Sequence, residues 1–588
     1  MKISKGIYNI KGCNCIARGY NFSITAKPNS RVELLIYDRN NLTANPDRVI
    51  MINEEYRMGN VYSVLLEDIN LRRCSYNYRI NGMMVCDPYG KAVFIDESGI
   101  YKSMVTSLKD FDWGEDKRPQ IPYNEMIIYR MHVKGFTSGV GSKVKKKGTF
   151  SAIMEKIPYL KELGITTIEL LPIHEYIDKN PNYWGYAGGY YFSPKMSYSS
   201  DKKLGGQVNE LKKLIKELHN NGIEIILEQY YLPNENPEVV IDSLKYWIYE
   251  YHVDGIHIIT YNDVEKMIAE IPELSEVKIF GNSWWNIDFS HKYLSDNHNL
   301  FEYNDSFMNT AKMFLKGDEN QVSAFIGNFK ANPKLCGKVN YIAHTNSFTL
   351  YDLVSYERKH NEINGENNRD GADFNYSWNC GVEGDTKNKK IQALRLKQMK
   401  NILCMLLLSQ AIPMILSGDE FANTQKGNNN PYCQDNEITW LDWRGLKKNS
   451  ELFGFVKKLI AFRKQHPVLR QKTELTLSDY KAVGTPDISF HGEKAWYPQI
   501  EVYQRTIGIF LCGQYAKVGD VYDDDIYMMF NMHWEEHRFA IPDTCDSKEF
   551  EIFLYTGDKE PLVIERSVVI EPRSVLIMLR KGGKISEL

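Results

Sequence analysis

The stretch IEIILEQYYLPNENPEVVIDSLKYWIYEYHVDGIHIIT, residues 223–260, decides the fold class of this chain. It begins with the apolar run 223–231, which has the length and composition of a buried strand. Residues 239–252 then carry apolar side chains at helical spacing. A second short apolar run, 253–260, follows an Asp-Gly pair and also reads as a buried strand. A strand, a helix and a strand in succession predict a βαβ unit with parallel strands.

The same alternation extends beyond this unit. Further apolar runs of strand length lie at 126–133, 165–173, 277–282 and 338–346. Helical patterns separate or follow them, at 157–164, 208–222, 391–410 and 455–470. Helices alternating with apolar strands predict a parallel array, most simply a central (β/α)8 TIM barrel.

The regions on either side of this array are rich in β-strand patterns. Residues 31–38, 61–69 and 76–85 are short runs of β-branched and aromatic residues, separated by Asn, Gly and Pro. The chain is β-rich again from about 475 to its end. We therefore predict a multidomain α/β protein with an N-terminal β-sandwich (1–115), a barrel (116–472) and a C-terminal β-sandwich (473–588).

Composition excludes several classes of partner. The 588 residues carry a formal net charge of -3, so no global field favours nucleic acid or an anionic membrane. The N-terminus lacks the apolar core of a signal peptide, and no stretch approaches a membrane span. The ten cysteines have no paired metal-site spacing and are expected to be reduced thiols. We expect a cytoplasmic protein without metal or cofactor.

Several long motifs resemble one enzyme family. They include YNYRINGMMVCDPYGKAV (76–93), NYWGYAGGYYFSP (182–194), the segment 353–386, and SGDEFANTQKGNNNPYCQDNEITWLDW (417–443). In this order they resemble the debranching branch of the α-amylase family, which comprises isoamylases, bacterial glycogen debranching enzymes and pullulanases. The resemblance runs almost end to end, and it implies a glucan-binding type of N-terminal sandwich. The family usually has Glu where Arg130 stands.

The resemblance also implies a reaction that this chain is not equipped to perform. Retaining glycosidases need two carboxyls about 5 to 5.5 Å apart, one as nucleophile and one as general acid. The family's nucleophile strand reads DGFRFD, and here it reads DGIHII, so Ile259 stands at the nucleophile and His257 at the arginine that orients it. Asn282 stands at the general acid, and Asn346 at the third acid. Neither Ile nor Asn can supply these functions.

Two further differences concern the floor and wall of the expected cleft. Glu228 keeps a charge where the family has an aspartate, in the strand that precedes the nucleophile strand. The connection after Pro233 is much shorter than in the family, whose loop there walls the substrate cleft. These losses indicate that the glycosidase function was abandoned, so we predict no catalytic residues.

Aromatic and amide side chains remain that could hold a glucan without acids. The motif NYWGY keeps Tyr183, Trp184 and Tyr186, and the family uses the tyrosine of this motif beneath the sugar. Trp284 and Tyr432 lie in motifs that approach the same face, and Asn282 and Asn346 could add hydrogen bonds. Each ring could instead support the barrel.

Three functions stay open from the sequence. The leading hypothesis is a noncatalytic homologue that binds α-glucan (glycogen or a maltooligosaccharide), or regulates an active debranching homologue as its partner. The second is an active α-1,6-glucan debranching hydrolase whose acids are rearranged, with Glu228, Asp370 or Asp373 in new roles. The third is an assembly protein whose cleft is closed by bulky side chains such as Tyr230, Tyr231 and Trp285.

Overall fold

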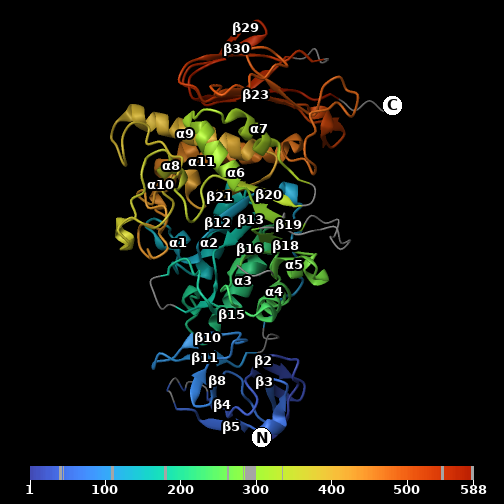
Figure 1. Ribbon diagram of the computed structural model, residues 1–588, viewed down its shortest axis with the longest axis vertical. Helices are drawn as coiled ribbons and strands as arrows, with labels where there is room; N and C mark the ends of the chain where they lie inside the picture. Colours follow the sequence, from blue (N-terminus) through green and yellow to red (C-terminus); the bar gives the residue numbers. More distant parts are fainter. Residues whose placement is uncertain are drawn as a thin grey trace.

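The computed structural model describes residues 1–38, 41, 43, 45–106, 111–177, 182–260, 264–282, 284, 299–333, 336–544 and 549–583. Figure 1 shows three parts along the long axis of the molecule. Antiparallel sheets near the N-terminus (blue) lie at one end, the barrel and its helices lie in the middle, and the C-terminal sheets (red) lie at the other end.

Two antiparallel sheets form the N-terminal part. Their strands are β1 (Lys2–Lys5), β2 (Gly12–Ile16), β3 (Gly19–Thr25), β4 (Val32–Tyr37), β5 (Arg48–Ile52), β6 (Arg57–Met58), β7 (Val61–Glu67), β8 (Ser75–Ile80), β9 (Met83–Val85), β10 (Val93–Ile95) and β11 (Tyr101–Met104). One sheet has the order β1-β7-β3-β2 and the other β10-β11-β8-β4-β5. Alternate side chains such as Phe22, Leu34 and Val64 are buried in one shared core.

Eight parallel strands close into a barrel, which confirms the predicted fold class. They are β12 (Ile128–Met131), β13 (Thr167–Leu170), β16 (Glu224–Tyr230), β17 (Gly255–Ile259), β18 (Lys278–Gly281), β19 (Leu300–Tyr303), β20 (Gly337–Tyr341) and β21 (Ile412–Leu416). The first and last strands pair, with Ile128 opposite Met414. Ile226, Phe280 and Phe301 help to fill the interior as a packed core.

Helices surround this barrel. They are α1 (Val133–Ser138), α2 (Phe150–Leu163), α3 (Gly206–Asn220), α4 (Pro237–Tyr251), α5 (Val264–Ala269), α6 (Asp305–Lys316), α7 (Val322–Lys330), α8 (Leu350–Leu353), α9 (Lys389–Leu408), α10 (Arg444–Lys448) and α11 (Ser450–Gln465). The predicted stop at Gly164 is confirmed, because this residue adopts φ 93° just after α2. The helix begins earlier than predicted, at a cap formed by the Thr149 side chain.

A hairpin inserted after β13 positions the NYWGY motif. Its strands are β14 (His174–Tyr176) and β15 (Gly189–Pro194), and the motif lies in the connection between them. A main-chain hydrogen bond ties this connection to a later loop of the chain, because Tyr183 N donates to Tyr432 O at 2.6 Å. The hairpin therefore holds aromatic side chains near the ends of the first barrel strands.

The C-terminal part consists of two larger sheets and one small one. Their strands are β22 (Ile488–His491), β23 (Thr506–Leu511), β24 (Lys517–Val518), β25 (Val521–Tyr522), β26 (Asp525–Asn531), β27 (His537–Ala540), β28 (Glu551–Tyr555), β29 (Leu562–Ile564), β30 (Ser567–Ile570) and β31 (Ser574–Arg580). The five-stranded sheet has the order β22-β23-β26-β31-β28, and the three-stranded sheet has the order β27-β30-β29. The boundaries at 115/116 and 472/473 remain predictions. No helix in the described part of the chain is long and apolar enough to cross a membrane.

Candidate functional site

Five barrel strands each contribute one polar side chain to a cluster below the C-terminal mouth of the barrel. These are Arg130 from β12, Glu169 from β13, Glu228 from β16, His257 from β17 and Tyr303 from β19. The register places Arg130 beside Glu169, and Glu228 beside His257. The side chains of Arg130, Glu169 and Glu228 are completely buried. We call these five residues the mouth cluster.

Arg130 is the centre of the mouth cluster. Its guanidinium forms ion pairs with Glu169 and with Glu228, the latter at 2.5 Å. It also donates to the hydroxyls of Thr345 and Tyr186, each at 3.1 Å. One side chain thus connects three strands, the loop after β20 and the NYWGY motif.

The two carboxyls of the cluster have different proton affinities. Burial opposes the ionisation of Glu169, but Arg130, His257 and hydrogen bonding outweigh it and lower the pKa of Glu169 to about 2. His257 Nδ1 lies 2.8 Å from Glu169, and Tyr303 donates to the same carboxylate. For Glu228, burial outweighs the attraction of Arg130 and raises the pKa. The Glu228 Oε1 atom is buried and has no hydrogen-bond partner among the described residues.

The spacing of the cluster would also suit a metal ion. Ligand atoms of Glu169, Glu228 and His257 all lie within 4.8 Å of one another. The guanidinium of Arg130 already supplies positive charge to both carboxylates, and it would repel a cation placed between them. The arrangement therefore fits an internal ion-pair network better than a metal centre.

Residues at the three positions expected to hold catalytic acids lie around the mouth. Ile259 is the last residue of β17 and is partly exposed. Asn282 follows β18 and is exposed, and its main-chain N–H donates to Glu265 at 3.3 Å. Asn346 is exposed in the loop after β20. None of these three side chains can form a glycosyl ester or act as an acid.

His344 lies close to the mouth cluster, in the loop after β20. Its ring centroid is 5.8 Å from that of Tyr303, and its Nδ1 is 2.9 Å from Asn346. Because β20 ends at Tyr341, the alternation of side chains along the strand does not determine the direction of His344.

The aromatic residues predicted to bind glucan lie in two different environments. Tyr183 and Trp184 pack in a small cluster with Leu171, and Tyr186 and Tyr432 lie against it. Trp184 is 6% exposed and Tyr183 is 7% exposed, whereas Tyr186 and Tyr432 are partly exposed. Trp284 is completely buried, and its indole donates to Phe301 O at 2.9 Å.

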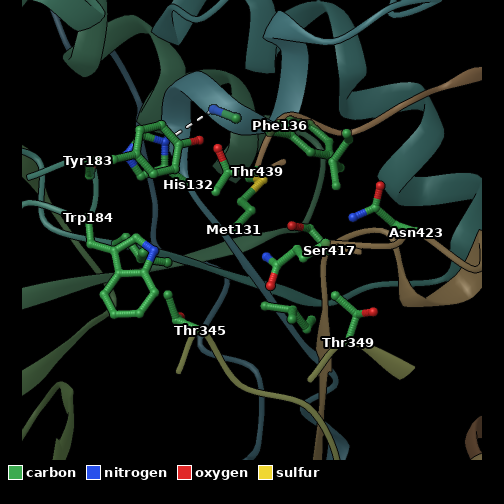
Figure 2. Close-up of a pocket in the computed structure, with 15 residues that line it drawn as sticks. Met131, His132, Phe136, Tyr183, Trp184, Thr345, Thr349, Ser417, Asn423 and Thr439 are labelled. Atoms are coloured by element: carbon green, nitrogen blue, oxygen red, sulfur yellow. Dashed lines mark hydrogen bonds between the residues drawn. The ribbon is translucent and has the colours of Figure 1, made fainter. Parts of the chain in front are cut away.

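A small cavity lies beside these rings at the mouth. Figure 2 shows Tyr183 and Trp184 on one side of it, and Thr349 and Asn423 on the other. Its volume is about 40 Å³, far below the roughly 300 Å³ at which small-molecule sites begin. The described side chains that line it include neither Asp nor Glu. In this structure the cavity is too small to hold a sugar.

The other acids considered from the sequence are engaged elsewhere. Asp370 accepts hydrogen bonds from Asn364 at 2.8 Å and from Asn430 at 3.0 Å. Asp373 is exposed and pairs with Lys359 at 2.7 Å. Both lie in the Asn-rich loops, where they stabilise the loop framework. Tyr230 and Tyr231 lie at the end of β16, and Trp285 lies outside the described residues.

Sequence reasoning missed three participants at the mouth. Glu169 and Tyr303 complete the mouth cluster, and Glu265 approaches Asn282 from α5. Burial raises the pKa of Glu265. The available signal was a charged residue inside an otherwise apolar strand, as in TIEL, because such a residue must find a partner within the barrel.

Sequence comparisons find relatives of this chain among known proteins. Residues 130–231 match the family model of the α-amylase catalytic domain. The chain is 30% identical to the glycogen operon protein GlgX homolog of Mycobacterium bovis, over 87% of this chain and 84% of that protein. It is 29% identical to chloroplastic isoamylase 1 of Arabidopsis thaliana, over 90% of this chain and 82% of that protein.

Comparisons of structure agree on the fold. The pullulanase from Bacillus acidopullulyticus superposes with a TM-score of 0.73 and 22% identity, covering 97% of this chain and 75% of that one. The pullulanase from Paenibacillus barengoltzii, solved in complex with maltohexaose and α-cyclodextrin, has a TM-score of 0.73 and 20% identity, covering 97% and 95% of the two chains.

Proposed function

The chain belongs to the debranching branch of the α-amylase family, and we propose that it is a noncatalytic member that binds α-glucan or regulates an active homologue. In this proposal the barrel mouth keeps a recognition role and has lost hydrolysis. The relatives support α-glucan as the class of ligand, and the residues of the mouth support the loss of hydrolysis.

The proposal rests on the burial and ion pairing of the carboxyls in the mouth cluster. A retaining glycosidase needs an accessible nucleophile and a proton donor. The buried carboxyls at the mouth, Glu169 and Glu228, both form ion pairs with Arg130 and have no solvent exposure. Because Ile259, Asn282 and Asn346 occupy the positions of the family's acids, the described residues offer no covalent route to hydrolysis at those positions.

Glucan binding is supported by the aromatic residues at the rim and by the relatives. Tyr186 and Tyr432 are partly exposed, and Asn282 and Asn346 present amides to solvent near the strand ends. Rings and amides together can hold the apolar face and the hydroxyls of a sugar. A pullulanase of the same fold was solved with maltohexaose bound, which makes a maltooligosaccharide a reasonable ligand for this chain.

Two assays on the full chain test the proposal. We expect no release of reducing ends from glycogen or pullulan, and retention of the protein by glycogen in co-sedimentation. Tyr432→Ala should weaken this retention at least fivefold. Tyr249→Ala serves as the matched control, since Tyr249 is 56% exposed on α4, away from the mouth. Hydrolysis by the wild type, or no retention by glycogen either alone or together with an active homologue, would contradict the proposal.

One observation favours a second candidate, an assembly protein with a closed cleft. The mouth cavity of about 40 Å³ does not admit a sugar in this structure. Under this alternative the chain would bind an active debranching homologue and would bind no maltooligosaccharide. Calorimetric titration of the wild type and of Tyr432→Ala with maltohexaose separates the two candidates, because only the first predicts heat of binding that this substitution reduces.

A further inference from the structure

A second cleft lies at the opposite end of the barrel from the mouth. It has a volume of about 370 Å³, within the roughly 300–1,000 Å³ typical of small-molecule sites. Glu224 begins β16, Asp254 precedes β17 and Lys278 begins β18, so the cleft opens at the N-terminal ends of these strands. We call it the lower cleft.

Two charged pairs lie at the lower cleft, and Arg118 and Glu276 add one further charge of each sign, so the charges largely cancel. Lys278 Nζ lies 2.6 Å from Glu224, whose carboxylate also accepts from the main-chain N–H of Ile121 at 2.8 Å. Asp254 lies 3.1 Å from the imidazole of His219. These pairs leave little net charge to attract a charged ligand.

The contacts of Arg118 also favour a neutral ligand. Its guanidinium donates to two main-chain carbonyls, Ile248 O at 2.7 Å and His252 O at 3.3 Å. These contacts hold Arg118 at the wall of the lower cleft, where it limits the shape of the site. A phosphate would have to compete with these carbonyls for the guanidinium, and also face the nearby carboxylates.

The remaining walls combine polar and apolar surface. Tyr123 contributes an aromatic ring, and Pro122 and Val277 contribute apolar surface. Gln120 and Ser275 contribute an amide and a hydroxyl. Asp254 Oδ1 is buried and has no hydrogen-bond partner among the described residues. A ring, apolar surface and several neutral hydrogen-bonding groups match a molecule with both C–H faces and hydroxyls.

We propose that the lower cleft binds a neutral polyhydroxylated molecule about the size of a mono- or disaccharide. This site is separate from the mouth, so it goes beyond the function proposed above and does not depend on it. Its ligand could be a free sugar or the end of a glucan chain, which share the same chemistry.

Calorimetry on the full chain tests this site with D-glucose, maltose and myo-inositol as probes, and with glycogen as the polymeric source. Glu276→Trp fills the lower cleft from its exposed rim without breaking the Lys278–Glu224 pair. We expect it to weaken binding of the small probes at least tenfold. Glu270→Trp is the matched control, because Glu270 is exposed on the same segment but does not line the cleft.

The outcomes separate this inference from the function proposed for the mouth. Tyr432→Ala should bind the small probes with the same affinity as the wild type. Glu276→Trp should bind them with lower affinity. Loss of glycogen retention in Glu276→Trp would identify a chain end as the source, whereas a loss confined to the small probes would identify a free sugar. The inference is overturned if none of the three small probes binds, if Glu276→Trp binds like the wild type, or if glucose 6-phosphate binds more tightly than glucose.

Discussion

Arg130 and Glu228 form an ion pair inside the barrel, and neither side chain is exposed to solvent. In the related enzymes a glutamate is usual at the first position, and an arginine stands where this chain has His257. In this chain the guanidinium that faces the buried carboxyls belongs to β12, and β17 contributes the imidazole of His257. Arg130 supplies positive charge to both carboxyls below the mouth, Glu169 and Glu228.

Removing this guanidinium should destabilise the barrel. Arg130→Met leaves Glu169 and Glu228 buried without their counter-ion, and breaking a buried pair in this way costs roughly 3–5 kcal/mol. We expect the midpoint of urea-induced unfolding to fall accordingly. Arg444→Met is the control, because the Arg444–Asp442 pair is largely exposed and its loss should change the midpoint little. Equal midpoints for the two variants would contradict the role given to Arg130.

Restoring one acid should not restore hydrolysis. Ile259→Asp places a carboxylate at the end of β17, but Asn282 still provides no proton to the leaving oxygen. We expect reducing-end assays on pullulan to stay at background for the wild type and for this variant. Ile259→Asn is the matched control for the change in polarity. Activity in the wild type that disappears in Glu228→Gln would instead show that the acids have been rearranged.

The stability of the barrel should depend on pH through His219. This imidazole lies between Asp254 and Asp116, at 3.1 and 2.9 Å. Burial disfavours its charged form, but both carboxylates outweigh burial and raise its pKa. Its contribution to stability is therefore fully present below the unfolded pKa of about 6.5 and is lost as pH rises through the folded pKa.

Unfolding in urea at pH 5.5 and at pH 8.5 measures this dependence. His219→Gln should lower the midpoint more at pH 5.5 than at pH 8.5. His360→Gln controls for the loss of a histidine, since His360 is 40% exposed beside Glu383. A larger loss at pH 8.5 would reverse the sign and show that His219 acts in its neutral form.

A second buried arginine, Arg463, should stabilise the fold through hydrogen bonds to main-chain carbonyls and not through an ion pair. Arg463 on α11 donates to several main-chain carbonyls around the end of α9, including Ser409 O at 2.5 Å and Ala411 O at 2.7 Å. Arg463→Met leaves these acceptors buried and unpaired, at a cost of about 1–3 kcal/mol for each one that water cannot reach. The urea midpoint should fall clearly, whereas the exposed neighbour Lys464→Met should have little effect.

Much of the barrel could be predicted because its strands are apolar and its helices are periodic. Two strands were nonetheless missed. β19 has only four residues, LFEY, and gives a weak signal. β21 contains Pro413, which normally argues against a central strand, although here it pairs with Asn340 in the closed barrel. Both strands are specified by closure of the barrel more than by local sequence.

The site was predictable only in part. Motif register identified Ile259, Asn282 and Asn346 as positions that lack acids, because register along a strand is a local property. The network of Arg130 with Glu169 and Tyr303 was not predicted, since it joins residues from strands far apart in the sequence. Whether a ring is exposed also depends on distant packing, which explains why Trp284 could not be distinguished from Tyr432 in advance.

The position of Arg130 has a consequence for biosynthesis. A chain is made from its N-terminus, at about 5–20 residues per second. Both carboxylate partners of Arg130 lie in β13 and β16, which leave the ribosome long before β21 is available to close the barrel. These buried charges are therefore synthesised together with their partners, before the last strand is available to close the barrel around them.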